Sequence, residues 1–365
     1  PPGRTLLGGF PFDWASRTPR LAKRHATETF GMIIAVANEA ALTISSINWV
    51  WFVGAVLVFL ALDLGVFHRK AHAVGFREAL IWTTIWFSMA MAFALCLAPM
   101  MIGDQWGDDH TNLFITGYVV ELSLSMDNVF VIALIFAYFR VPLEYQHRVL
   151  FWGILGALVM RGAMIFGGAG LIHQFDWILY VFGAFLLFSG IKMLFVGDEE
   201  VEPEKNVLIR LARRIYPVTT QFVGQRFFTK LDGRRALTPL ALCLIMVETT
   251  DLIFAVDSIP AIFGITTEPF IVFTSNVFAI LGLRSLYFVL VGLLRHFCYL
   301  KYGLALVLVF VGFKMLIVLW GGRPEWLNFE DNHNGVLIIV AALLGLSIVA
   351  SLFAPKKEPA KTGGT

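Results

Sequence analysis

The sequence predicts an all-α fold, a polytopic membrane helix bundle of about nine transmembrane helices with two inverted three-helix repeats. Three observations predict it. The 365 residues are 58% hydrophobic, and their mean hydropathy of +0.76 lies outside the range of soluble proteins. About nine stretches match the roughly 20 apolar residues that cross a bilayer as helix. Two parts of the chain also resemble each other in the order of their charged residues.

The chain opens with residues 1–46, which we leave unassigned because Asn38 and Glu39 interrupt their apolar stretch and no initiator Met precedes them. Residues 47–98 are expected to form two peripheral transmembrane helices, and residues 334–354 a final one. The individual spans are expected near residues 48–67, 79–98, 113–139, 150–172, 177–196, 238–264, 270–293, 302–320 and 335–353.

The two repeats are expected over residues 112–196 and 238–320, because each contains two carboxylates six residues apart followed by an Arg and a Lys. The corresponding residues are Glu121 and Asp251, Asp127 and Asp257, Arg161 and Arg284, and Lys192 and Lys314. Each unit has an odd number of spans, so the second should cross the membrane in the opposite direction to the first. The intervening residues 197–237 begin acidic and continue basic and partly amphipathic, and we interpret them as a solvated cytoplasmic linker in preference to a regulatory domain.

Lys and Arg residues divide unequally between the predicted loops. Eight basic residues lie between Lys205 and Arg235, whereas the loops on the other side hold one, Arg323. Basic loops stay in the cytoplasm, so nine spans would run from an outside N-terminus to a cytoplasmic polar tail at residues 355–365. The basic residues of segment 1–46 disagree with this arrangement. We expect a multi-pass protein of a bacterial-type plasma (inner) membrane.

Five carboxylates fall inside the spans of the two repeats: Glu121, Asp127, Glu248, Asp251 and Asp257. An acid at the centre of a span costs about 2.5 to 3.5 kcal/mol on insertion scales, and the span over 238–264 carries three. Such residues must face protein, water or a cation, so they are functional candidates.

Two interpretations of these acids stay open: a cation or proton site, or a structural network of ion pairs with Arg161, Arg284, Lys192 and Lys314. No His lies in the middle of a span and the cysteines do not cluster, which disfavours zinc and copper. Carboxylates and the amides of Asn128 and Asn276 offer oxygen ligands for a hard ion such as Mn²⁺, Mg²⁺ or Ca²⁺.

Residues six apart on a helix point about 120° away from each other. For Asp251 and Asp257 to bind one ion, the helix between them would have to be broken. Pro260 offers a means, because its ring disturbs the turn that contains Val256. The sequence therefore predicts a discontinuous helix at this point.

Several other functions are disfavoured. The chain has no H-E-x-x-H motif for a zincin-type protease, no G-x-G-D motif, and no G-x-x-x-x-G-K-[ST] motif for ATP. Cys96, Cys243 and Cys298 are far apart and suggest neither disulfides nor a metal site. We therefore expect no enzyme, no resident cofactor and no nucleic-acid partner. The expected partners are membrane lipid and a divalent metal ion, and no particular oligomeric state is predicted.

Three segments, GYVVELSLSMDNVFV, FDWILYVFGAFLLFSGIKM and ETTDLIFAVDSIPAIFGITTEPFIVFTSNVFAILGLRSLYF, resemble the TerC family of membrane proteins, including its Alx branch. The likeness runs from about residue 48 to 353. The family is named for an association with tellurium resistance, its members are linked to manganese export, and its fold is placed near the LysE exporter superfamily. The resemblance implies that the family's motif positions, and hence the metal ligands, are Glu121, Asp127, Asn128, Glu248, Asp251 and Asp257.

The sequence thus predicts a secondary transporter that exports divalent cations, Mn²⁺ first among them, through an intramembrane carboxylate site. The alternative is a membrane scaffold or assembly factor in the response to metal or tellurium stress, with the acids as structural ion pairs. Direct transport of tellurite is less attractive, because an acid-lined site repels an oxyanion.

Overall fold

The computed structural model of the chain describes residues 44–62, 75–175, 177–195, 206–231, 233–293, 299–319 and 333–353. Most of segment 1–46, all of tail 355–365, Arg323 and Cys298 lie outside these ranges, so the interpretations that concern them are not addressed by the structure.

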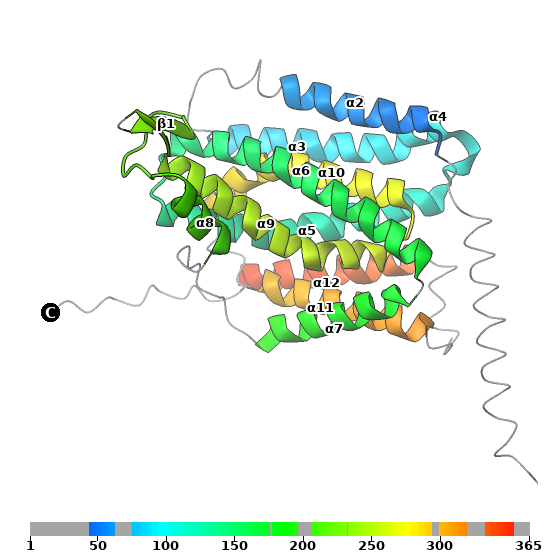
Figure 1. The fold of residues 1–365 in the computed structure, drawn as a ribbon. Helices are drawn as coiled ribbons and strands as arrows, with labels where there is room; N and C mark the ends of the chain where they lie inside the picture. The colour runs from blue at the N-terminus through cyan, green and yellow to red at the C-terminus, as the bar shows by residue number, and fades with distance from the viewer. Residues whose placement is uncertain are drawn as a thin grey trace, which may run out of the picture.

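The described part is a bundle of long helices with one small hairpin (Figure 1). The helices of the first half are α2 (Ser46–Leu62), α3 (Phe76–Ala92), the π-helical turn η2 (Phe93–Leu97), α4 (Ala98–Ile102), the short 3₁₀ turn η3 (Gly103–Gln105), α5 (Asp108–Tyr138), α6 (Leu143–Gln174) and α7 (Ile178–Phe195). The second half contains α8 (Val207–Ile215), the antiparallel strands β1 (Phe228–Leu231) and β2 (Arg234–Leu237), α9 (Pro239–Phe263), α10 (Pro269–Leu293), α11 (Leu300–Leu319) and α12 (His333–Phe353).

Within the described ranges, seven helices are long and apolar enough to cross a membrane, which confirms the predicted polytopic helix bundle. They cover Phe76–Gln105, Asp108–Tyr138, Leu143–Gln174, Ile178–Phe195, Pro239–Phe263, Pro269–Val291 and Leu300–Ile317. Two shorter apolar helices, Ser46–Ala61 and Gly335–Ser351, lie where the first and last spans are expected. The count of nine transmembrane helices stays a prediction.

Local sequence explains where several helices start and stop. Thr238 caps α9, since its hydroxyl accepts a hydrogen bond from the Ala241 amide at 3.4 Å, and Pro239 follows at the first helical position, where its missing N–H is not needed. Between α5 and α6 the chain turns at Arg140, which adopts a left-handed φ of 52°. The turn is completed by Pro142, directly before α6, so the two helices form an antiparallel pair.

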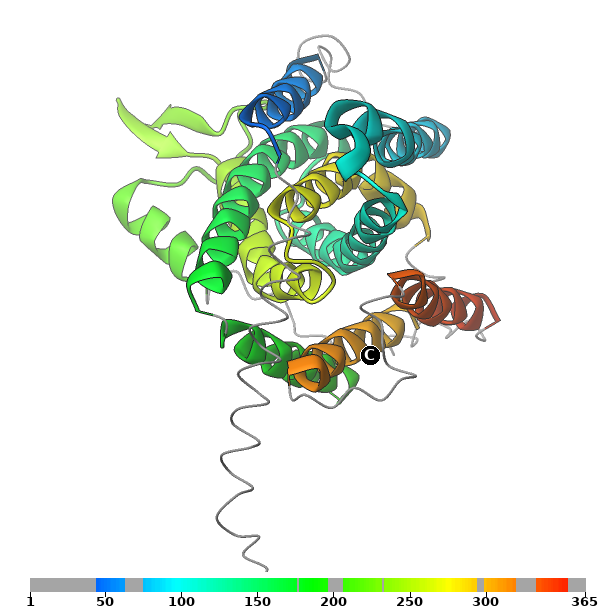
Figure 2. The same ribbon diagram turned by 90° about the vertical axis from the view of Figure 1, so that its right-hand side faces the viewer.

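Viewed down the bundle, α5, α6, α9 and α10 form the centre (Figure 2). Helices α2 and α3 cover one side, where aromatic rings pack α2 onto α10, for example Trp49 against Phe270 at 5.0 Å between ring centroids. Helices α7, α11 and α12 cover the other side. The four central helices carry the acids and the arginines of the two predicted repeats.

The packing follows the division into two units. The first helix of each unit packs against the second helix of the other, in the pairs α5 with α10 and α9 with α6, and the two third helices, α7 and α11, pack together. Two structurally related three-helix units would give these reciprocal helix contacts. The inverted orientation of the units stays a prediction.

Candidate functional site

Arg161 on α6 is the centre of a buried polar cluster between α5, α6 and α9. Its side chain is 2% exposed, so the guanidinium is removed from solvent and lipid. Nη2 donates to Oδ1 of Asp251 at 3.0 Å and Nε donates to Oδ2 at 3.3 Å, a two-pronged contact. Nη1 donates to Oε1 of Glu121 and to Oγ of Ser258, the latter at 3.4 Å. One guanidinium therefore joins two carboxylates from different helices.

Helix geometry explains why these residues meet. Glu121 and Asn128 are seven residues apart on α5, which is nearly two turns, so they share one face. Asp251 and Ser258 share a face of α9 in the same way. Asn128 also reaches across and donates from Nδ2 to Oδ1 of Asp251 at 3.5 Å. These faces of α5 and α9 thus meet, and Arg161 of α6 lies between them.

The cluster has more acceptor capacity than its donors use. Two carboxylates and one guanidinium leave a formal charge of −1 in the interior. Within the described residues, the second oxygen of Glu121, Oε2, is buried without a hydrogen-bond partner. The buried hydroxyl of Ser125, one turn further along α5, and both polar atoms of the Asn276 amide on α10 also have none there. Buried polar groups of this kind are normally satisfied by water or an ion.

Glu248 lies one turn before Asp251 on α9, at the contact with α6. Its carboxylate is half-buried and lies against Gly156, where a β-carbon would overlap the carboxylate oxygens. Among the described side chains no ion pair is found for Glu248. Gly156, which the sequence analysis did not single out, therefore makes room for an acid between two transmembrane helices.

Asp257 faces a different neighbour from Asp251. Its Oδ1 accepts a hydrogen bond from the hydroxyl of Ser189 on α7 at 2.8 Å. Lys192, three residues further along α7, is close enough to attract the same carboxylate. The sequence analysis missed Ser189 because a single Ser in an apolar span carries no distinguishing pattern.

The predicted break in the helix at Pro260 is wrong. Helix α9 continues from Pro239 to Phe263, and although Pro260 in its last turn cannot donate a hydrogen bond to Val256, it does not interrupt the helix. Asp251 and Asp257 therefore point in different directions, the first toward α6 and the second toward α7. A single ion shared by both carboxylates does not fit this arrangement.

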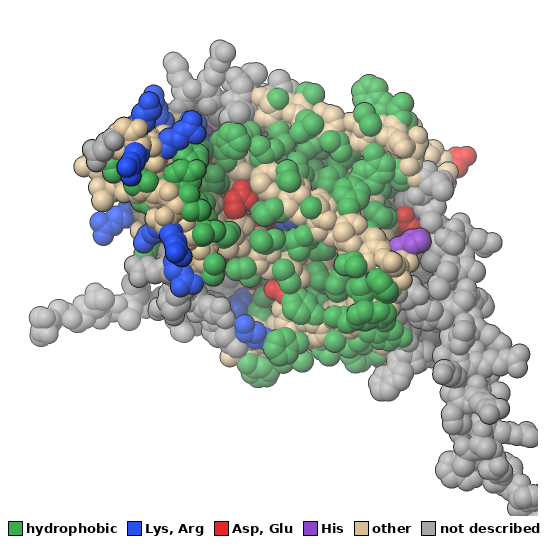
Figure 3. Space-filling view, in the orientation of Figure 1, with side chains coloured by type: hydrophobic (Ala, Val, Ile, Leu, Met, Phe, Trp, Pro, Cys, Tyr) green, Lys and Arg blue, Asp and Glu red, His purple; other side chains and the backbone are tan. Residues whose placement is uncertain are grey.

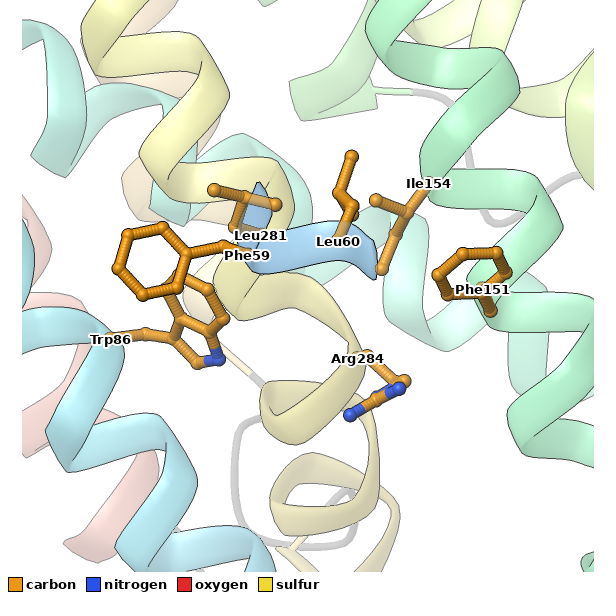
Figure 4. Close-up of a pocket in the computed structure, with 7 residues that line it drawn as sticks. All are labelled: Phe59, Leu60, Trp86, Phe151, Ile154, Leu281 and Arg284. Atoms are coloured by element: carbon orange, nitrogen blue, oxygen red, sulfur yellow. The ribbon is translucent and has the colours of Figure 1, made fainter. Parts of the chain in front are cut away.

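The remaining candidates lie apart from the cluster. Asp127 is half-buried on α5, next to Asn128 but turned to another face. Arg284 lies on α10, beside apolar side chains of α2, α3, α6 and α10 itself (Figure 4). These side chains are Phe59, Leu60, Trp86, Phe151, Ile154 and Leu281.

The six predicted metal ligands thus separate into parts. Glu121, Asn128 and Asp251 meet at Arg161, whereas Glu248 lies against Gly156 on α6 and Asp257 bonds to Ser189 on α7. In the described ranges, no three residues of the types His, Cys, Asp and Glu come together in a way that could hold a metal ion. The arrangement therefore offers three acids along α9, Glu248, Asp251 and Asp257. Asp251 pairs with Arg161, which also binds Glu121 of α5.

Comparison with known proteins gives consistent matches. The family model described as "Integral membrane protein TerC family" matches residues 106–359. An uncharacterized membrane protein of Myxococcus xanthus is 50% identical over 313 residues, which cover 85% of this chain and 93% of the relative. No solved structure matches the chain.

Two further relatives carry the name "Putative membrane-bound redox modulator Alx". The one from Photorhabdus laumondii is 43% identical over 316 residues, 86% of this chain and 96% of the relative. The one from Escherichia coli K12 is 48% identical over 274 residues, 74% of this chain and 85% of the relative. All of these matches include the helices that carry the Arg161 cluster.

Proposed function

The chain belongs to the TerC family of integral membrane proteins, and from this membership we propose that it is a secondary transporter that exports a divalent metal cation, Mn²⁺. The observation that carries the proposal is the buried cluster in which two carboxylates share the Arg161 guanidinium while Glu121 Oε2 has no partner among the described residues. A buried excess of negative charge is costly unless something positive compensates it.

The substrate cation would compete with Arg161 for the same carboxylates. When the guanidinium withdraws, Glu121 and Asp251 become available, together with the amide oxygen of Asn128 and the hydroxyl of Ser258. This is an all-oxygen set of the kind that Mn²⁺, Mg²⁺ and Ca²⁺ prefer. Return of the guanidinium would then expel the ion. The positive charge of Arg161 would thus keep the site from binding the cation too tightly.

The other acids of α9 would serve as steps on the way through the membrane. Glu248 lies about 4.5 Å before Asp251 along the helix axis, and Asp257 lies about 9 Å beyond it. Because these residues face α6 and α7 respectively, a cation would pass from one helix contact to the next. Polar residues inside a membrane typically mark such a route.

Manganese is proposed over calcium and magnesium because the family resemblance links members to manganese export; ligand chemistry alone accommodates all three ions. We propose that the end of the bundle with α8 and the hairpin faces the cytoplasm, because it carries most of the basic loop residues. We propose exchange against H⁺ or Na⁺ as the source of energy, and transport without an enzymatic activity.

A second candidate function is supported by the same cluster. Arg161 pairs with Glu121 and Asp251 across three helices, as a purely structural ion pair would. In that case the protein is a membrane scaffold or assembly factor whose acids only hold the bundle together. The two functions differ in whether removing a carboxylate changes manganese handling.

Cellular manganese content distinguishes them. Cells that lack their own manganese exporter would be loaded with manganese, and their metal content compared with the wild type, Asp257→Asn and Asp104→Asn. We expect the wild type and Asp104→Asn to lower cellular manganese, because Asp104 is exposed at the end of the bundle. Asp257→Asn nearly keeps the shape but removes the charge, and should leave manganese as high as in cells without the protein.

Expression and membrane insertion must be equal for this comparison. Equal manganese content in cells with wild-type protein and with Asp257→Asn, at equal expression, would favour the scaffold. Loading with calcium or magnesium in place of manganese tests the choice of cation in the same cells.

A further inference from the structure

The segment between the two repeats contains an ordered surface that the transport site does not use. We call helix α8 and the hairpin β1–β2 together the basic platform. Asn206 fixes the start of α8, because its side-chain oxygen accepts hydrogen bonds from the amides of Leu208 at 2.9 Å and Ile209 at 3.1 Å. Ile209 is fully buried, and Asn206 Nδ2 also contacts the sulfur of Met246 on α9 at 3.3 Å. The platform is therefore docked on the bundle.

Helix α8 has three distinct faces, since successive residues are rotated by about 100°. Ile209 and Ala212 face the protein. Beside them lies an exposed basic face, formed by Arg210, Arg213 and Arg214. The third face is exposed and apolar, and its members and exposed fractions are Val207 66%, Leu208 46%, Leu211 50% and Ile215 61%.

The hairpin continues the same combination of charge and apolar surface. Phe228 is 58% exposed and Leu231 is 43% exposed. Lys230 lies directly opposite Arg235 in the strand register. Like charges at opposite positions destabilise a hairpin, and a two-stranded hairpin is only marginally stable by itself. An anion bound between Lys230 and Arg235 would remove this repulsion.

The platform lies across one end of the bundle. Helix α8 runs across the direction of the long helices and projects from their circumference (Figures 1 and 2). Lys and Arg side chains gather at this end in the space-filling view (Figure 3). An amphipathic helix that lies at the end of transmembrane helices is placed at the level of the lipid headgroups.

We infer that the basic platform binds the anionic phospholipid headgroups of the membrane leaflet around it. The arginines of α8, with Lys230, Arg234 and Arg235, contact phosphate groups, while Leu211 and Ile215 insert into the boundary between headgroups and acyl chains. Charge complementarity identifies this partner: three arginines on one short helix suit a negatively charged surface, and the neighbouring apolar face suits the lipid interior beneath it. An acidic protein would satisfy the charges but would leave the apolar face without a matching environment.

Hydrogen exchange in lipid nanodiscs tests the inference. The full-length protein would be placed in discs of phosphatidylcholine and in discs of an equal mixture of phosphatidylcholine and phosphatidylglycerol. Each basic residue near an anionic surface contributes about 1 kcal/mol of binding free energy, which is roughly a fivefold change in the binding constant. We therefore expect amide exchange over Val207–Ile215 to slow about tenfold or more in the anionic discs, and high salt to reverse the effect.

Variants identify the groups responsible. The combined substitution Arg210→Gln, Arg213→Gln and Arg214→Gln should abolish the difference between the two discs, whereas the matched change of the same residues to Lys should keep most of it. Equal exchange of the wild type in both discs overturns the inference without any variant. A glutamine variant that still responds to phosphatidylglycerol overturns it as well.

Two further additions separate the headgroup from other anions. Glycerol phosphate added to neutral discs should not slow exchange, because the inference requires the membrane surface. If glycerol phosphate, or an acidic polypeptide such as polyglutamate, slows exchange in neutral discs while phosphatidylglycerol does not, the platform binds a free anion or a protein and the inference is wrong. None of these outcomes depends on whether the protein transports manganese.

Discussion

Arg161 determines how the buried acids of this protein are compensated. Its guanidinium binds Asp251 through two nitrogens and reaches Glu121 with the third. A buried ion pair adds little stability compared with apolar packing, but removing one partner leaves an uncompensated charge. Arg161 therefore holds the two acids in place, and its removal would take away the positive partner that both of them contact.

Replacing Arg161 by Gln should reveal this role. We expect the thermal stability of the purified protein to fall by the equivalent of about 3 to 5 kcal/mol, because two buried carboxylates lose their counter-charge. Added Mn²⁺ should restore part of the loss in Arg161→Gln and should stabilise the wild type less, since there the ion must displace the guanidinium. Thermal unfolding in detergent, with and without Mn²⁺, measures both effects.

Arg161→Lys is the matched control, because it keeps the charge but lacks the planar fork that contacts Asp251 twice. Its loss of stability should be smaller. If Mn²⁺ leaves the unfolding temperature of Arg161→Gln unchanged, the Arg161 carboxylates do not bind the ion.

At the level of residues, the sequence shows which acids lie inside the helices and on which helix face, but not which partners they contact. The spacing of seven between Glu121 and Asn128, and between Asp251 and Ser258, already places each pair on one face. Arg161 and Arg284 hold equivalent positions in the predicted repeats, and the structure places Arg161 between Glu121 and Asp251 but Arg284 beside apolar side chains of α2, α3 and α6. The different surroundings of the two arginines depend on how the helices cross, and the local sequence does not predict that.

At the level of elements, the contact between α7 and α11 holds the outer layer to the site. Glycines on both helices allow a close approach: a β-carbon on Gly190 would lie 2.9 Å from the carbonyl oxygen of Ala305, and one on Gly312 would lie 2.8 Å from that of Gly183. Small residues are typical of tight helix contacts in membranes. Because Ser189 precedes Gly190, this contact also positions the hydroxyl that binds Asp257.

Gly190→Leu should therefore separate α7 from α11 and displace Ser189. Overpacking of this kind costs about 1 to 3 kcal/mol, and we expect a lower unfolding temperature together with loss of manganese export. Gly167→Leu is the matched control, because a β-carbon on Gly167 meets no atom within 4 Å. Equal behaviour of the two variants in thermal unfolding and export would contradict the proposed role of the α7–α11 contact.

The helices themselves could largely be predicted, because apolar stretches of membrane-spanning length leave the backbone no alternative to helix. The effect of Pro260 on α9 could not be predicted from the sequence. A proline kinks some helices and leaves others continuous, and only the structure shows that α9 runs past Pro260 and ends at Phe263.

At the level of the whole molecule, charge is distributed unevenly between the two ends. The exposed basic residues of α8 and the hairpin lie at one end, and the exposed acids Asp104 in η3 and Asp108 at the start of α5 lie at the other. By the positive-inside rule, this asymmetry predicts that the basic end faces the cytoplasm. The sequence predicts the same orientation, because loop charges do not depend on tertiary packing.

Labelling of introduced cysteines measures the orientation directly. In a background with the native cysteines replaced by alanine, Asp104→Cys should react with a membrane-impermeant maleimide in intact cells. Arg234→Cys should react only after the inner membrane is permeabilised. The reverse pattern would place the basic platform outside the cell and would contradict the proposed direction of export.

The central claim is that the buried acids carry a divalent cation through the bundle, and manganese flux into proteoliposomes measures it most directly. The purified wild type and Asp104→Asn should admit Mn²⁺ to vesicles that contain a manganese-sensitive dye, because Asp104 is remote from the cluster. Asp251→Asn should admit none beyond empty vesicles, although it remains folded. Equal flux through the wild type and Asp251→Asn, or no flux through folded wild-type protein under any imposed H⁺ or Na⁺ gradient, would contradict the account.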